Sequence, residues 1–78
     1  MLWLPGNAAT SDTPSAAFVD AEVLEFGGDL QGALRAYQRV AAEGRDGRVA
    51  PALARVARVQ RKLGRAEAAV ATYDLLAQ

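Results

Sequence analysis

The residues best suited to chemistry in this 78-residue chain are carboxylates, arginines and two tyrosines, because it contains no Cys and no His. That composition excludes a thiol nucleophile, Ser–His catalysis and nearly every zinc site. Glu22 and Glu25 stand three residues apart, so on a helix they would share one face, as a catalytic carboxylate pair can. The pattern offers them no third partner, and Tyr37 and Tyr73 stand at repeated positions that favour core packing. The sequence therefore predicts no catalytic residue, no metal site, no cofactor and no enzyme.

The charged residues are unevenly distributed along the chain. Residues 1–43 hold six acidic and two basic side chains, whereas residues 44–78 hold three acidic and seven basic ones. Arg55, Arg58, Lys62 and Arg65 fall on one helical stripe, with Arg61 beside it. One interpretation is a site for an acidic peptide or a nucleic-acid phosphate; the other is ion pairing inside the molecule. No aromatic residue interleaves the stripe to stack bases, and the net charge is zero, so we expect no nucleic-acid partner.

The elements that must position these residues are four helices. Thr13-Pro14 begins the first, which runs to about Phe26, and Asp29 is a good N-cap for a second that ends near Glu43. A third helix is expected at about 49–63 and a fourth from 66 onward, with Gly27-Gly28 and Gly64 as helix terminators. No segment alternates as a strand does, so the fold class is all-α.

Residues 1–13 are expected to form a tail. Its start, 1–5, is either an ordinary hydrophobic end or the trimmed end of a membrane helix or signal segment. No apolar run is long enough to span a bilayer, so we expect no membrane insertion by this segment. The compartment stays open between the cytoplasm and the periplasm of a bacterium.

An internal repeat is the strongest signal in the chain. At an offset of 36 residues Gly28 falls on Gly64, and Tyr37 falls on Tyr73. Further pairs are Ala21 with Ala57, Ala33 with Ala69, and Val23 with Val59. A period of this size predicts two helical hairpins, residues 14–43 and 49–78, stacked side by side.

The phrases at 28–37 and 63–73 resemble the second-helix signature of the tetratricopeptide repeat family: a turn Gly, a small Ala, an apolar residue and an aromatic residue. The resemblance covers residues 14–78 and implies a right-handed α-solenoid fragment in which Tyr37 and Tyr73 fill gaps between helices. Asp20, where the family has a core aliphatic residue, and the 36-residue period depart from its pattern.

The resemblance also implies an inner groove lined by the first helix of each unit. Its candidate partner-binding residues here are Phe18, Glu22, Glu25, Phe26, Arg58, Arg61 and Lys62. Phe18 and Phe26 are either exposed anchors for a partner or buried core residues. Because equivalent positions of stacked repeats are neighbours, we also expect three ion pairs at the repeat offset: Glu22–Arg58, Glu25–Arg61 and Asp29–Arg65.

The function that this pattern favours is a non-catalytic helical-repeat module for protein–protein interaction, with a protein or peptide partner. The alternative is an extracytoplasmic sensor segment of a bacterial membrane-bound signalling protein, such as a histidine kinase. Two repeats leave an apolar side bare, and residues 74–78 end within a helix. We therefore expect a piece of a longer protein that self-associates through its open end.

Overall fold

The computed structural model describes residues 13–44 and 47–78, which form four α-helices. They are α2 (Thr13–Phe26), α3 (Leu30–Glu43), α4 (Val49–Lys62) and α5 (Ala66–Ala77). These ranges contain no strand, so the all-α prediction with four helices is confirmed for the described part of the chain. The predicted tail lies outside the described residues as far as residue 12.

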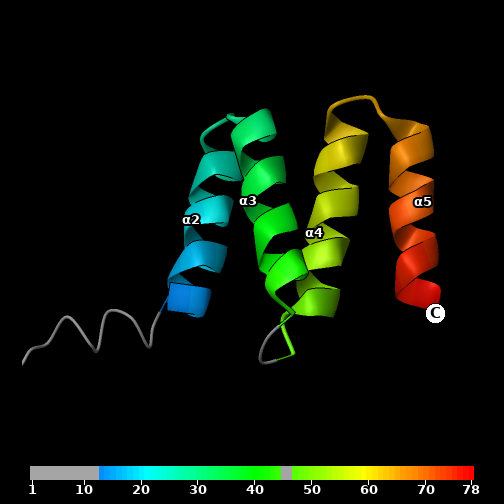
Figure 1. The fold of residues 1–78 in the computed structure, drawn as a ribbon. Helices are drawn as coiled ribbons and strands as arrows, with labels where there is room; N and C mark the ends of the chain where they lie inside the picture. Colours follow the sequence, from blue (N-terminus) through cyan, green and yellow to red (C-terminus); the bar gives the residue numbers. More distant parts are fainter. Residues whose placement is uncertain (1–12, 45–46) are drawn as a thin grey trace, which may run out of the picture.

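The four helices stand side by side in chain order, each running opposite to the one before it (Figure 1). Contacts link α2 with α3, α3 with α4, and α4 with α5. Within the described part of the chain, the inner helices α3 and α4 therefore have a neighbouring helix on two sides, whereas the edge helices α2 and α5 have one on a single side.

The turns inside the two hairpins have the same backbone structure. Gly28 and Gly64 adopt φ values of 96° and 80°, in the left-handed region that a side chain disfavours. The next residue then donates its N–H to the carbonyl five positions earlier, from Asp29 to Leu24 at 2.9 Å and from Arg65 to Gln60 at 2.8 Å. The backbone of the turn therefore repeats at the 36-residue spacing found in the sequence.

Asp29 caps α3 as predicted. Its Oδ1 accepts a hydrogen bond from the N–H of Gly32 at 2.9 Å, satisfying one of the free donors of the first turn. The other end of α3 is closed by Gly44 in the left-handed conformation, with φ 61°. The corresponding position before α5 is Arg65, whose side chain makes no capping bond.

The hydrophobic core lies mainly between α3 and its two neighbours. Its cluster consists of Ala21, Ala33, Leu34, Tyr37, Val56 and Val59. The small side chains of Ala21 and Ala33 are fully buried where α2 meets α3, and Tyr37 fills the space beside them with no exposed surface.

Tyr73 does not fill an equivalent space, and the prediction that it is a core residue is wrong. Its side chain is 41% exposed, although it stands 36 residues after the buried Tyr37. The reason is the position of its helix: α4 covers the face of α3 that carries Tyr37, whereas no described helix covers the matching face of α5.

A buried polar pair joins the two helices of each hairpin, and the sequence analysis missed both. The Tyr37 hydroxyl donates to Glu25 Oε1 at 2.9 Å, and the Thr72 hydroxyl donates to Gln60 Oε1 at 2.7 Å. Each pair spans 12 residues of sequence. Among the described residues no buried side-chain polar atom lacks a hydrogen-bond partner.

Candidate interaction surface

The predicted groove is occupied by a cluster of ion pairs centred on Glu25. The side chain of Glu25 is fully buried, and the basic groups reach it from α4. Arg58 donates through Nε to Oε2 at 2.8 Å and through Nη2 to Oε1 at 2.6 Å, and Lys62 Nζ lies 2.8 Å from Oε2. With the Tyr37 hydroxyl, four donor contacts surround one carboxylate. These bonds connect α2 to α4, which are not neighbours in the row of helices.

The electrostatics of this cluster keep Glu25 ionised. Burial by itself would raise the pKa of its carboxyl group, but hydrogen bonds from Arg58, Lys62 and Tyr37 outweigh burial and lower the pKa to about 2. The pKa of Tyr37 is raised, first by burial and then by its bond to the Glu25 carboxylate. A carboxylate held in this state at neutral pH is a structural anion and is not poised for proton transfer.

Arg55 forms a second link between the same helices. Its Nη1 lies 2.5 Å from Glu22 Oε2 and 3.3 Å from the Tyr37 hydroxyl. Its guanidinium also lies over the Phe18 ring, 5.0 Å from the centroid, and Phe18 meets Tyr37 edge-to-face at 5.6 Å between centroids. Arg55 was not among the predicted groove residues. Its position on the same basic stripe as Arg58 and Lys62 is the sequence feature that could have included it.

The predicted ion pairs are wrong in register. Glu22 and Glu25 pair with Arg55 and Arg58, which are 33 residues further along and not 36. Three residues correspond to about one helical turn, so each carboxylate meets the arginine one turn before its repeat equivalent. Glu25 pairs with Arg58 and Lys62, and the side chain expected to pair with it, Arg61, is exposed.

Asp29 was predicted to pair with Arg65, but its carboxylate instead caps α3.

The structure brings five of the seven predicted groove residues together around Glu25, with Arg61 exposed beside them and Phe26 on another side of α2. Phe18, Glu22, Glu25, Arg58 and Lys62 form the cluster just described, with Phe18 half-buried in it. Phe26 is 72% exposed and contributes to another surface. The two phenylalanines are therefore neither both exposed nor both buried.

That other surface is the α2 outer face, which the sequence analysis did not single out. Its exposed residues follow helical spacing: Ala16, Val19, Asp20, Val23 and Phe26. Val19 is 53% and Val23 63% exposed, which is unusual for valine. Because α2 has apolar residues on several sides, its sequence pattern does not indicate which side faces away from the core.

The α5 outer face is a second apolar stripe at the opposite edge of the row. It comprises the exposed residues Ala66, Val70, Tyr73 and Ala77, spaced four, three and four residues apart. Val70 is 58% and Tyr73 41% exposed. The molecule thus carries one apolar stripe on each of its two edge helices.

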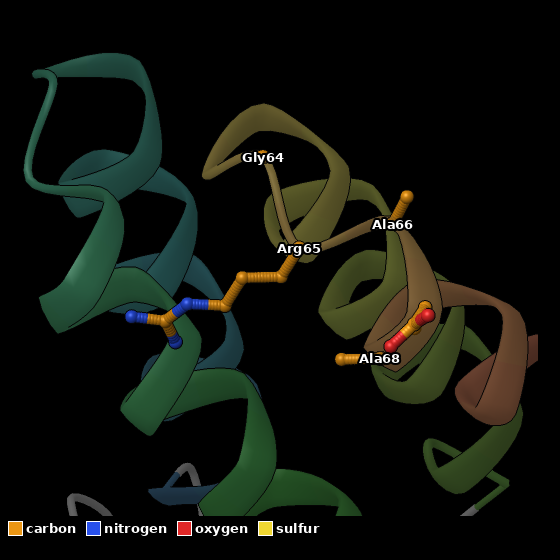
Figure 2. A pocket seen from close by; sticks show the side chains of 5 residues that line it. Gly64, Arg65, Ala66 and Ala68 are labelled. Atoms are coloured by element: carbon orange, nitrogen blue, oxygen red, sulfur yellow. The ribbon is translucent and has the colours of Figure 1, made fainter.

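The described surface has open depressions, one of them beside the Glu25 cluster. Arg58, Arg61 and Lys62 line that one, and residues 64–68, at the start of α5, line another. In Figure 2 the Arg65 side chain extends from the beginning of α5, while Ala66 and Ala68 present only their methyl groups. The first depression is lined by three basic side chains, two of which already bond Glu25, and the second is lined mainly by small residues.

Residues 13–44 and 47–78 contain no group of three or more acidic residues that could hold a metal ion. None of the helices in these ranges has the length and apolar character needed to cross a bilayer.

Comparison of the chain with protein-family models, with curated proteins and with solved structures finds no match.

Proposed function

We propose that this chain is a non-catalytic helical-repeat module that binds proteins through its α2 and α5 outer faces. The observation that carries the proposal is the exposure of Val19, Val23 and Phe26 on one side of α2. Large apolar side chains gathered on one exposed face are typical of interaction surfaces.

The ion pairs around Glu25 make the α2 and α5 outer faces better binding surfaces than the predicted groove. Glu22, Glu25, Arg55 and Arg58 are engaged with one another across α2 and α4. A peptide that used these groups would have to displace existing ion pairs and leave Glu25 buried without partners. A partner bound to the outer faces would break none of these ion pairs.

The tetratricopeptide-like architecture belongs to the same proposal. The identical turns 36 residues apart and the fully buried Ala21, Ala33 and Tyr37 support it. In an arrangement of this type, each hairpin offers one face to the preceding unit and one to the following unit. We infer a right-handed solenoid whose two ends are the outer faces.

Site-specific photo-crosslinking in cells that express the chain tests this function. A photoreactive residue at Val23 or Val70 is expected to capture a protein, whether another copy or a different chain. Leu75 is the matched control, because it is 55% exposed on α5 but lies off the stripe. Absence of crosslinked protein at Val23 and Val70, or equal capture at Leu75, would contradict the proposal.

A further inference from the structure

We propose that the partner of each outer face is a second copy of this chain, bound head to tail, with the α5 outer face of one copy against the α2 outer face of the next. The inference rests on the proposed function and adds the identity of the partner and the geometry of binding. Its template is the interface between α3 and α4 inside one chain.

The two open faces carry repeat equivalents of the residues at the centre of the internal interface, two of them identical and one a Val in place of Leu. Leu34 and Tyr37 of α3 share one core cluster with Val59 of α4. Thirty-six residues after the first two stand Val70 and Tyr73, and 36 residues before Val59 stands Val23. The α5 outer face thus repeats the α4-facing side of α3, and the α2 outer face repeats the α3-facing side of α4.

The internal residues and their repeat equivalents differ in exposure. Leu34, Tyr37 and Val59 are 6%, 0% and 0% exposed, whereas their equivalents are 58%, 41% and 63% exposed. A second copy placed as α4 lies on α3 would cover all three. Burial of such side chains is the main driving force of association.

The internal template selects head-to-tail binding over the pairing of like edges. Leu34 and Tyr37, which lie with Val59 in the core, recur on α5 as Val70 and Tyr73, and Val59 recurs on α2 as Val23. Only contact between α5 of one copy and α2 of the next therefore rebuilds the internal interface. Charge does not make this choice, because α2 and α5 both carry acidic residues and no basic ones. The interface is therefore heterologous, and each copy keeps one further face for extension.

Three positions on the α2 outer face differ from the template: Val19, Asp20 and Phe26 stand where α4 has Arg55, Val56 and Lys62. Of these template residues only Val56 is buried. Asp20, which is exposed, stands 36 residues before the buried Val56. A carboxylate carried into the interface loses hydration, so it weakens the association relative to the internal interface. The Asp20→Val variant is expected to associate roughly tenfold more tightly, a gain that a face unused in assembly would not show.

Sedimentation equilibrium of two complementary variants tests the geometry. Val23→Glu blocks the α2 face and leaves the α5 face intact, and Val70→Glu does the reverse. Both side chains are more than half exposed, so circular dichroism is expected to show an unchanged fold. The wild-type chain should form larger species with rising concentration, each variant alone should stay monomeric, and their equimolar mixture should form a dimer and nothing larger.

The control for these variants is Leu75→Glu, which places the same charge on α5 away from the stripe and should assemble like the wild type. A monomeric wild-type chain at every concentration would overturn the inference, as would a mixture that fails to dimerise. Persistent dimers of either blocked variant alone would also overturn it, since they indicate pairing of like edges.

These failures are distinguishable from failure of the proposed function. A chain that never self-associates, yet is crosslinked to a different protein at Val23 and Val70, loses the head-to-tail partner and keeps its role as an interaction module. A chain that shows neither association nor crosslinking loses both.

Discussion

At the scale of single residues, Glu25 determines how the two hairpins are joined. Its side chain has no exposed surface, and an unpaired carboxylate in such a place would be strongly destabilising. Arg58, Lys62 and Tyr37 supply donors from α4 and α3, and the two basic side chains keep 38% and 43% of their own surface in water. The carboxylate is thus fully paired while its basic partners stay partly hydrated, which limits the desolvation penalty of the cluster.

The pairing of Glu25 with Arg58 and not with Arg61 can be tested by replacing each arginine with alanine. Arg58→Ala removes two hydrogen bonds to Glu25, and we expect the free energy of unfolding to fall by about 1–3 kcal/mol. Arg61→Ala, the same change one turn later on an exposed side chain, should alter it by less than about 0.5 kcal/mol. Urea denaturation followed by circular dichroism measures both; equal effects would contradict the register.

The acid stability of the protein should depend on Glu25. Its pKa falls from 4.5 to about 2 on folding, so its stabilising contribution is complete above pH 4.5 and is lost as the pH drops through 2. The shift corresponds to about 3 kcal/mol. Unfolding free energies measured between pH 6 and pH 2 should decline in the wild type, and the decline should be shallower in Glu25→Gln. Parallel curves for the two proteins would show that Glu25 is not responsible.

At the scale of the elements, each hairpin is held by a repeated turn, but the ends of the helices are not repeated. Asp29 donates its N–H to close the end of α2 and uses its carboxylate to cap α3. Arg65 makes the same backbone bond at the end of α4 but provides no cap for α5. The backbone geometry requires only the glycine of the turn, whereas the cap requires a side-chain acceptor that Arg lacks.

The cap of α3 explains a glycine in the interior of that helix. A Cβ at Gly32 would overlap the Asp29 carboxylate, so Gly32→Ala loses the cap, worth about 1 kcal/mol, while gaining a similar amount of helix propensity. We expect little net change in stability in the wild type. In an Asp29→Ala background, which has no cap to lose, Gly32→Ala should stabilise by about 1 kcal/mol. A thermal-denaturation double-mutant cycle checks this, and additive effects would rule out the coupling.

The sequence predicted those features that depend on local patterns. The helices, the glycine turns, the Asp29 cap and the buried Tyr37 follow from spacing and residue type alone. Tyr73 and the ion-pair register did not follow, because the repeat alignment treats both units as having the same neighbours. An edge helix lacks a neighbour that an inner helix has, and a long arginine side chain can meet a carboxylate one turn away from its equivalent.

At the scale of the whole molecule, a row of four helices has two ends, and both ends are apolar. The internal junction between α3 and α4 buries Leu34, Tyr37 and Val59, whose repeat equivalents are exposed at the two ends. The equivalents of the α3 residues stand on α5 and the equivalent of Val59 stands on α2, so the two ends differ. In the proposed head-to-tail assembly, each molecule can therefore bind another copy at either end.

Cysteine crosslinking between copies tests this account most directly, because the natural chain contains no Cys to interfere. A mixture of Val23→Cys and Val70→Cys chains, oxidised and analysed by mass spectrometry, should give the mixed disulfide-linked dimer as its main product. A Val23→Cys and Leu75→Cys mixture should give far less of the mixed dimer. Equal yields from the two mixtures, or a predominance of dimers between identical chains, would contradict the binding of α5 to α2.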